Sequence, residues 1–448
     1  REALSAGIDF DLSDGSVYRT LVAQVKSGKV PESEVDTAAG RMLAAKFRLG
    51  LFEHPYVDPV YAQKTTDDLT HQKLTLKAAQ EEIALLKNQG NLLPLDTKKL
   101  HTIAVIGPDA ADTHLGGYSR QPSHTVSILE GIRERLADTG VNVLYAKGCK
   151  ITDGIPGWRG WYENNVKVVD PSTQQDDIRA AASTARRADV AIVVIGGDET
   201  TTREAWNEEH LGDRSSLDLL GAQKQLVKAV FDTGTPTVVF LINGRPLSVN
   251  WVAANIPAIL EGWYPGAEGG TAAAQVLFGD INPGGKLPVT FPRSVGQLPD
   301  FYDHKPSRNR SYAFVDNSAL FPFGYGLSYT TFRFDNVRVS PTKMNPGDTA
   351  TVSVDVTNTG NREGDEVAEL YIHQRLSTVT QPVMALRGFK RISLQPGQTT
   401  TVQFKLTPDS LSVVDENMKR TVQPGVFDIM VGPSSVETQR AELEVTGE

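Results

Sequence analysis

Short runs of β-branched residues alternate with longer amphipathic stretches through the middle of this chain. The runs predict buried strands, and the stretches predict helices. The predicted strands are 101–106, 141–145, 190–195, 237–242 and 258–261, and the predicted helices are 176–187, 215–231 and 270–278. Strands that alternate with helices are typical of a layered α/β sheet. We therefore expect an α/β sandwich domain over residues 101–300.

From about residue 340 the apolar positions recur at every second residue, as in Val352, Val354 and Val356. Turn sequences rich in Asn, Pro and Gly separate these runs. A period of two with frequent turns predicts a β-sandwich of the immunoglobulin or fibronectin type III kind. We expect this sandwich over residues 340–448, after a linker at 301–339.

The apolar pattern of the first 54 residues predicts one strand end and two helices. Residues 6–10 read as the strand end, and the longer helix is expected over 32–47. So small a piece cannot bury a core by itself. It would expose an apolar face in isolation, and the residues expected on that face are Ile8, Phe10, Leu21, Val25, Leu43 and Phe47. A linker with a connecting helix at 74–87 is expected over 55–100.

Composition and charge exclude several functional classes. A chain of 448 residues with 40% hydrophobic and 22% charged residues is typical of a soluble protein of roughly two to three domains. The net charge of −9 and the lack of a basic block argue against a nucleic-acid partner. No apolar run approaches the roughly 18 residues of a membrane span. The single Cys149 excludes an intrachain disulfide, and no histidine spacing resembles a metal site. We therefore expect no metal, no cofactor and no membrane association.

The segment at 196–214 carries the strongest chemical signal, because it follows the apolar run 190–195 directly. Its six carboxylates are Asp198, Glu199, Glu204, Glu208, Glu209 and Asp213. A doubly wound sheet binds its ligands where such strands end. Glycoside hydrolysis needs two carboxyl groups, one to protonate the leaving oxygen and one to attack or to activate water. A solvated acidic loop is the alternative interpretation.

Seven motifs resemble, in order and spacing, those of glycoside hydrolase family 3, the family of many β-glucosidases and β-xylosidases. They are AGID at 6–9, KFRLGLF at 46–52, LLKN at 85–88, NGRP at 243–246, WYPG at 263–266, LFGDINPGGKLP at 277–288 and FGYGLSY at 323–329. The resemblance covers essentially the whole chain. It implies a multidomain α/β plus all-β fold: the end of a (β/α)8-like barrel over 1–54, an α/β sandwich domain, and a C-terminal fibronectin type III-like β-sandwich.

The resemblance also implies a Glu that acts as general acid and base in the loop after a strand of the sandwich domain. This Glu lies upstream of an Asp-Arg pair, which the chain has at 213–214, although Leu220 replaces the usual Pro further on. Glu204 is the best match. Glu208 and Glu209 remain as alternatives, because the length of this loop varies.

Five further residues are candidates for substrate binding, namely Asp9, Trp158, Trp161, Arg203 and Trp206. Asp9 is the matched position of the barrel, and its alternative role is to cap a turn near residue 13. Trp158 and Trp161 lie in a Gly-rich loop where the resemblance implies an aromatic wall for the aglycone. Arg203 and Trp206 adjoin Glu204 and offer a hydrogen-bond donor and a stacking face, although Trp206 could equally pack the loop.

In the family, the catalytic nucleophile is an Asp in a Ser-Asp-Trp-like motif of the barrel, upstream of the segment matched at 6–9. No Ser-Asp-Trp occurs in these 448 residues. We therefore expect the nucleophile to lie outside this chain, on an upstream barrel fragment that acts as its partner. A homo-oligomer is a further possibility, and the resemblance favours a periplasmic or secreted location.

The expected function is that of one component of a retaining, exo-acting β-glycosidase. Its substrate would be a β-linked oligosaccharide or aryl glycoside, from which it releases terminal glucose. A β-xylosidase or arabinosidase of the same family is the alternative. A non-catalytic carbohydrate-binding or scaffolding fragment is the alternative from another class.

Overall fold

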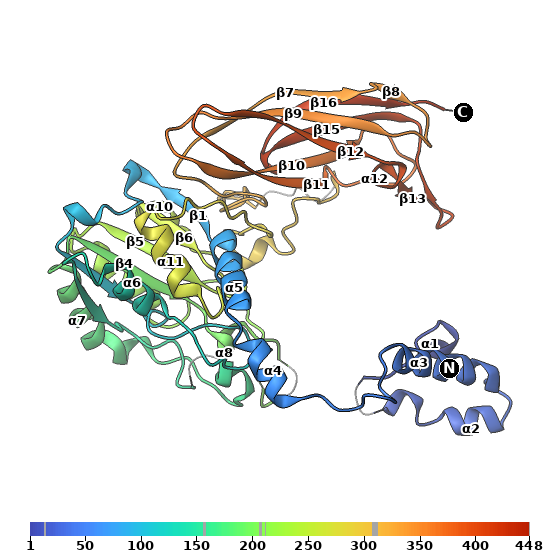
Figure 1. The fold of residues 1–448 in the computed structure, drawn as a ribbon, viewed down its shortest axis with the longest axis horizontal. Helices are drawn as coiled ribbons and strands as arrows, with labels where there is room; N and C mark the ends of the chain where they lie inside the picture. Colours follow the sequence, from blue (N-terminus) through green and yellow to red (C-terminus); the bar gives the residue numbers. More distant parts are fainter. Residues whose placement is uncertain (13–14, 156–157, 206–207, 211, 307–311, 448) are drawn as a thin grey trace. The chain divides into compact units, whose positions relative to one another are not determined.

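The computed structural model describes residues 1–12, 15–155, 158–205, 208–210, 212–306 and 312–447. The chain divides into two compact units, Arg1–His71 and Gln72–Glu448. Figure 1 shows the path of the chain through each unit, coloured by residue number.

The first unit is helical in its described residues. Its helices are α1 (Glu2–Ser5), the 3-10 helix η1 (Ser16–Tyr18), α2 (Leu21–Lys26), α3 (Glu32–Arg48) and α4 (Pro59–Thr66). The strand end predicted at 6–10 is wrong, because a strand needs a neighbouring strand to bind its backbone and none is described in this unit. The helix α4 also interrupts the predicted linker, and the Asp58 carboxylate caps it by accepting from the Val60 amide at 2.9 Å.

The apolar face expected in this unit is exposed in part. Ile8 and Phe10 are each 54% exposed, and Phe47 is 62% exposed. Leu21 and Val25 differ from the expectation, since both pack against a small core of Leu4, Val30 and Ala38. The unit therefore buries few apolar side chains and leaves large ones in solvent.

The second unit contains a mixed sheet built mainly from the predicted strands. In its described residues, the sheet has the order β1-β6-β5-β4-β2-β3. The strands are β1 (Ala84–Asn88), β2 (Thr102–Ile106), β3 (Asn142–Ala146), β4 (Val190–Gly196), β5 (Thr237–Ile242) and β6 (Ala258–Glu261). Strands β2 to β6 pair in parallel, and β1 pairs with β6 in the antiparallel direction.

The helix predicted at 74–87 is wrong over its last five residues, 83–87. Helix α5 (Leu69–Glu82) ends early, and residues 84–88 form β1 instead. The physical reason is the apolar run Ala84, Leu85 and Leu86, which is fully buried along the edge of the sheet. Periodicity alone cannot separate a short buried strand from a helix.

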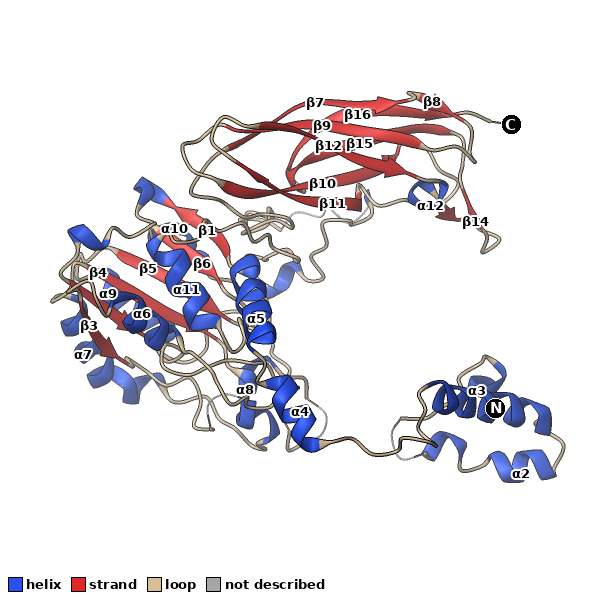
Figure 2. Ribbon diagram, in the orientation of Figure 1, coloured by secondary structure: helices blue, strands red, loops and turns tan. Residues whose placement is uncertain are grey.

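Helices cover both faces of this sheet, as Figure 2 shows. One face packs against α6 (Ile128–Leu136) and α11 (Gly269–Phe278). The other packs against α7 (Gln175–Ala185), α9 (Gln223–Phe231) and α10 (Asn250–Asn255). Helix α9 begins at Gln223, so the helix predicted at 215–231 is shorter than expected. The short helices are α8 (Glu199–Thr202), α12 (Pro408–Leu411), η2 (Gln89–Asn91), η3 (Thr97–Lys99), η4 (Trp158–Tyr162), η5 (Pro171–Gln174) and η6 (Val295–Gln297).

The C-terminal part is a β-sandwich, which confirms the period-two prediction. In the described residues, one sheet has the order β11-β10-β15-β16-β8 and the other the order β12-β9-β7. Alternate residues such as Val352, Val354 and Val356 point into the shared core. The strands are β7 (Phe332–Ser340), β8 (Lys343–Met344), β9 (Ala350–Asn358), β10 (Gly364–Gln374), β11 (Ala385–Leu394), β12 (Thr399–Leu406), β13 (Val413–Val414), β14 (Arg420–Thr421), β15 (Gly425–Ser434) and β16 (Glu437–Val445).

Helices α6 and α11 approach so closely that a side chain does not fit at Gly131. A Cβ atom there would lie 2.1 Å from the carbonyl oxygen of Gly270. We expect Gly131→Ala to lower the unfolding free energy by about 1–3 kcal/mol, despite the better helix propensity of Ala. Urea denaturation followed by tryptophan fluorescence measures this change. Gly296→Ala in η6, where no neighbour lies closer than 3.6 Å, is the matched control and should change little. Equal stability of the two variants would contradict the close packing.

Candidate functional site

The carboxyl ends of β2 and β4 lie side by side at the point where the strand order reverses. From β2 the chain passes through α6 to β3 on one side, and then returns through α7 to β4 on the other side of β2. Such a reversal leaves a crevice between the two strand ends, where doubly wound sheets bind ligands. The segments that begin there are 107–120 after β2 and 197–214 after β4.

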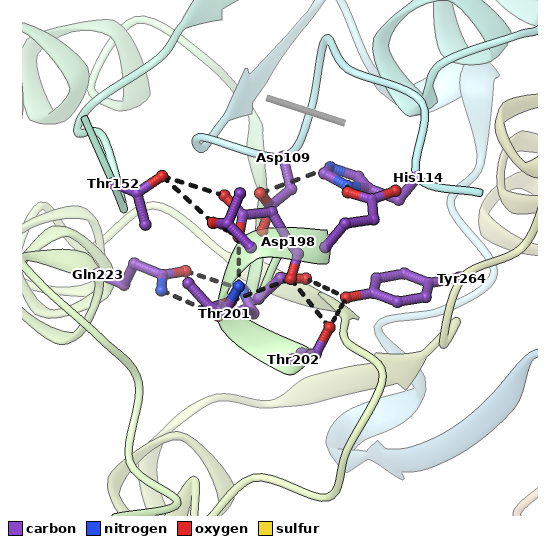
Figure 3. Close-up of polar contacts among 12 residues, drawn as sticks. Asp109, His114, Thr152, Asp198, Thr201, Thr202, Gln223 and Tyr264 are labelled. Carbon is purple, nitrogen blue, oxygen red and sulfur yellow. Dashed lines mark hydrogen bonds and ion pairs between the residues drawn. The ribbon is translucent and has the colours of Figure 1, made fainter. Parts of the chain in front are cut away.

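The second segment starts with a tightly capped turn, the short helix α8. The Asp198 Oδ1 atom accepts hydrogen bonds from the Thr201 amide at 3.0 Å and from the Thr200 hydroxyl at 2.6 Å. Figure 3 shows this cap and its neighbours. Asp198 is only 5% exposed, and its bonds satisfy backbone and hydroxyl donors at the start of the helix. Its carboxylate therefore shapes the turn.

Two side chains from other elements fix the backbone on either side of this turn. The Gln223 amide of α9 accepts from the Gly196 amide at 2.8 Å and donates to the Gly196 carbonyl at 3.0 Å. The Tyr264 hydroxyl bonds the Thr202 hydroxyl and lies 3.3 Å from the Gly197 carbonyl, as Figure 3 shows. The segment thus leaves the sheet in one defined direction.

A buried carboxylate ties this turn to the segment after β2. Glu199 is fully buried, and its Oε1 atom accepts from the amides of Leu115 at 3.0 Å and Gly116 at 3.3 Å. Its Oε2 atom lies 3.1 Å from His114 Nδ1. His114 Nε2 in turn lies 3.6 Å from Asp109 Oδ1. We call Asp109, His114 and Glu199 the buried cluster.

Burial and charge act in opposite directions on the side chains of the buried cluster. Burial by itself lowers the pKa of His114, but the hydrogen bond to Glu199 and the charge of Asp109 outweigh it and raise this pKa to about 9. Burial by itself raises the pKa of Glu199, yet the hydrogen bond and charge of His114 leave it below its usual value. For Asp109, burial dominates and raises the pKa to about 7. The cluster therefore holds a charged imidazolium against Glu199 at neutral pH.

Arg203 follows α8 and anchors a second loop. Its side chain is 1% exposed, and one guanidinium nitrogen donates to the carbonyl oxygens of Gly160 at 2.9 Å, Trp161 at 3.0 Å and Glu163 at 2.5 Å. Further along, the amide of Asn165 donates to the Glu209 carbonyl at 3.0 Å. These bonds hold the loop around η4 against the segment after β4. With Arg203 engaged in this way, its contact with substrate stays a prediction.

The three candidate acid/base residues lie in the outer part of the same segment. The side chains of Glu204, Glu208 and Glu209 are all exposed. The backbone around Glu204 is packed against the returning chain, since a Cβ atom at Gly212 would lie 2.6 Å from the Glu204 carbonyl carbon. The Ala205 amide also donates to Asp213 at 3.3 Å. The six carboxylates thus divide into a buried pair, Asp198 and Glu199, and four exposed side chains.

The other predicted site residues are distributed as follows. Trp161 is half-buried, and its ring lies against Gly117 and 5.2 Å from the ring of Tyr118. Trp158 begins η4, but its side chain is not described, and Trp206 lies outside the described residues. Asp9 belongs to the first unit and pairs with Arg41 at 2.9 Å. The structure therefore brings Trp161 and Arg203 together with the Glu204 segment.

His114 and Asp109 were not predicted from the sequence as parts of this site. Both follow the buried strand β2, as Asp198 and Glu199 follow β4. The signal for Asp109 was the matching pattern of an apolar strand, then glycine, then acidic residues, at 102–109 and 190–199, and this pattern does not include His114. Only the strand order shows that the two patterns are neighbours.

In the described part of the chain, no group of three or more His, Cys, Asp or Glu side chains could hold a metal ion. None of the described helices is both long and apolar enough to cross a membrane.

Comparison with known protein families gives two matches. Residues 83–329 match the model described as the glycosyl hydrolase family 3 C-terminal domain. Residues 366–435 match the model described as the fibronectin type III-like domain. The first match covers the α/β part of the second unit, and the second lies within the β-sandwich.

Similar proteins include glycosidases that are named for different sugars. The chain is 41% identical to a β-xylosidase of Formosa agariphila, over 96% of this chain and 59% of that protein. It is 38% identical to a periplasmic β-glucosidase of Salmonella typhimurium, over 99% of this chain and 60% of that protein. A solved β-glucosidase from Erythrobacter marinus superposes with a TM-score of 0.93 at 41% identity, over 99% of this chain and 59% of that one. The chain therefore spans about three fifths of the length of these relatives.

Stability should depend on pH through His114. Its pKa of about 9 in the folded protein lies above the ordinary 6.5, so the folded protein binds this proton more tightly than the unfolded chain does. The resulting stabilisation is present in full below pH 6.5 and is lost as the pH rises to about 9. We expect His114→Asn, which cannot be charged, to remove on the order of 3 kcal/mol of this pH dependence.

The measurement is urea unfolding at pH 6.5 and at pH 9 for the parent and the variant. His101→Asn removes a histidine whose side chain is 91% exposed and serves as the matched control. The same loss of stability between the two pH values in the parent and in His114→Asn would show that the buried cluster does not hold the proton.

Proposed function

The chain belongs to glycoside hydrolase family 3, and on that basis we propose that it supplies the general acid/base of a retaining, exo-acting β-glycosidase. Such an enzyme releases a terminal β-linked sugar through two displacements at the anomeric carbon. The proposal is supported by an exposed carboxylate, Glu204, on a firmly held segment at the carboxyl edge of the parallel sheet.

Glu204 is favoured as the acid/base by the way its backbone is held. Arg203, the residue before it, is anchored through its guanidinium, and its carbonyl accepts from Arg245 at 3.2 Å. Ala205, the residue after it, donates to Asp213. A catalytic carboxyl group must be held in position by its supporting backbone, while the group itself reaches the substrate. Glu208 and Glu209 are the alternatives.

The catalytic nucleophile would come from outside these 448 residues, on the barrel portion of the enzyme. Two observations support this proposal. The relatives extend well beyond the region that they share with this chain. The first unit also exposes Ile8, Phe10 and Phe47, which further barrel elements would cover.

The remaining candidates are proposed to bind the substrate or to support the loops that do. Trp161, on the loop that Arg203 anchors, would form part of an aromatic wall for the aglycone together with Trp158, and Trp206 would stack on a sugar. Asp9, in the first unit, stays a candidate for substrate binding. Arg203 would contribute mainly by holding the aglycone loop in place.

Glucose is the sugar that we propose for the terminal position. Solved relatives named β-glucosidase support it, including the Erythrobacter marinus protein. Xylose is the second candidate, because the Formosa agariphila relative at 41% identity is named a β-xylosidase. Assays with aryl β-glucosides and aryl β-xylosides separate the two.

The name of the Salmonella typhimurium relative also supports a periplasmic location.

Replacing the acid/base should affect substrates unequally. In the enzyme assembled with its barrel portion, we expect Glu204→Gln to lower turnover of glycosides with poor leaving groups by about 100-fold or more. Activated aryl glycosides need little protonation, so their first step should lose much less. Azide should restore the turnover of the activated aryl glycosides, because a small anion can attack the glycosyl-enzyme without a general base.

The matched controls are Glu208→Gln and Glu209→Gln, which change carboxylates of the same loop. Both should retain the activity of the parent on both substrate classes. If either control shows the unequal loss and the azide rescue while Glu204→Gln does not, the acid/base role belongs to that residue.

Retention fixes the stereochemistry of the product. In a retaining enzyme the two carboxyl groups lie about 5–5.5 Å apart, which leaves no room for an attacking water in the first step. We therefore expect the β-anomer as the first product, observed by proton NMR before mutarotation. The α-anomer as the first product would contradict a double displacement.

A further inference from the structure

A cavity of about 200 Å³ opens beside the buried cluster at the switch point of the sheet. Residues of three segments line it: Asp109 and His114 after β2, Lys150 and Thr152 after β3, and Asp198 after β4. None of Glu204, Glu208 and Glu209 lines this space. It is smaller than the roughly 300–1,000 Å³ of pockets for drug-sized ligands, so it fits a compact molecule.

Two buried polar atoms at this cavity lack hydrogen-bond partners in the described part of the structure. They are Asp109 Oδ2 and His114 Nε2, on side chains that are 2% and 4% exposed. Buried polar atoms are almost always satisfied, and those that are not call for an explanation. One is an acceptor, and the other is a donor when the imidazole is charged. Figure 3 shows the two side chains facing each other.

A hydroxyl group satisfies this pair, because it donates to one atom and accepts from the other. The rest of the lining offers the same mixture of donors and acceptors. Further carboxylates come from Asp112, Asp153 and Asp198, ammonium groups come from Lys147 and Lys150, and a hydroxyl comes from Thr152.

Charge argues against an ion as the ligand. The carboxylates of the lining would repel an anion, and Lys147, Lys150 and the charged His114 would repel a cation. The described residues also hold no cluster suited to a metal. A neutral molecule with several hydroxyl groups can donate hydrogen bonds to the carboxylates and accept them from the ammonium groups, and it is not repelled by either charge.

We propose that this cavity binds one small neutral polyhydroxyl molecule of the size of a monosaccharide, with a hydroxyl group between Asp109 Oδ2 and His114 Nε2. Such binding is separate from the proposed hydrolysis and does not depend on it. The site is built from the 448 residues themselves, because all three lining segments belong to the second unit.

The test is a titration of the 448-residue chain, labelled at isoleucine methyl groups, with glucose and with xylose. Ile151 lines the cavity and reports on it, whereas Ile429 lies in the core of the β-sandwich. We expect the Ile151 methyl resonance to shift saturably with at least one sugar, while the Ile429 resonance stays in place. Magnesium ions and glucose 6-phosphate are the charged probes, and neither should shift the Ile151 resonance at comparable concentration.

Two variants test the chemistry of the site. Lys150→Met removes an exposed ammonium group at the cavity, and Asp109→Asn changes the buried carboxylate with little change in shape. Each should weaken sugar binding by about tenfold. Lys167→Met, which removes another exposed lysine of the same loop, and Glu204→Gln should leave the affinity unchanged.

Three outcomes would overturn the proposal. The first is an Ile151 resonance that no sugar shifts in the folded chain. The second is a response to the charged probes alone. The third is an equal affinity for the sugar in Lys150→Met and Lys167→Met. This comparison still tests the proposal if Asp109→Asn fails to fold.

Discussion

The buried carboxylate of Glu199 is the interaction on which the arrangement of the site depends. It accepts from the amides of Leu115 and Gly116 and lies against the imidazole of His114, so it joins the segment after β2 to the segment after β4. Removal of one partner would leave the others buried without compensation, which costs several kcal/mol in comparable pairs. These contacts therefore fix the start of the loop that carries Glu204.

This arrangement divides the carboxylates of one loop into a buried pair and an exposed group. Asp198 and Glu199 are buried and bind backbone amides, so they act as structural groups. Glu204, Glu208 and Glu209 remain in solvent, where a carboxyl group can meet a substrate. Arg203 lies between the two groups in the sequence. Its guanidinium binds the Trp161 carbonyl and so holds the loop of Trp161 against this segment. An acid/base on a loop needs such support, since small displacements reduce catalysis strongly.

The two units differ in how far they bury their apolar residues. The sheet of the second unit is covered on both faces, and β4 is buried at every position. The first unit has a small core around Leu4, Val30 and Ala38 and exposes larger side chains such as Phe47. The small core of the first unit is too limited to cover these larger side chains.

The sequence by itself determined strands β2 to β6 of the sheet, the period-two sandwich and the family, because these depend on local apolar patterns and on motifs that are contiguous in the chain. The last five residues of the helix expected at 74–87 failed for the opposite reason. Residues 84–88 form a strand because β6, 170 residues later, offers its edge to them. A contact over such a distance leaves no periodic signal.

Tertiary structure alone decided the chemistry of the individual polar residues. Glu199 and Glu204 are five positions apart and equal in type, yet one is fully buried against His114 and the other is exposed. His114 gave no signal in the sequence, because its partners Asp109 and Glu199 meet it only through the order of β2 and β4. The sequence can name the residues that carry charge, but burial and partners decide their protonation, and both are properties of the folded chain.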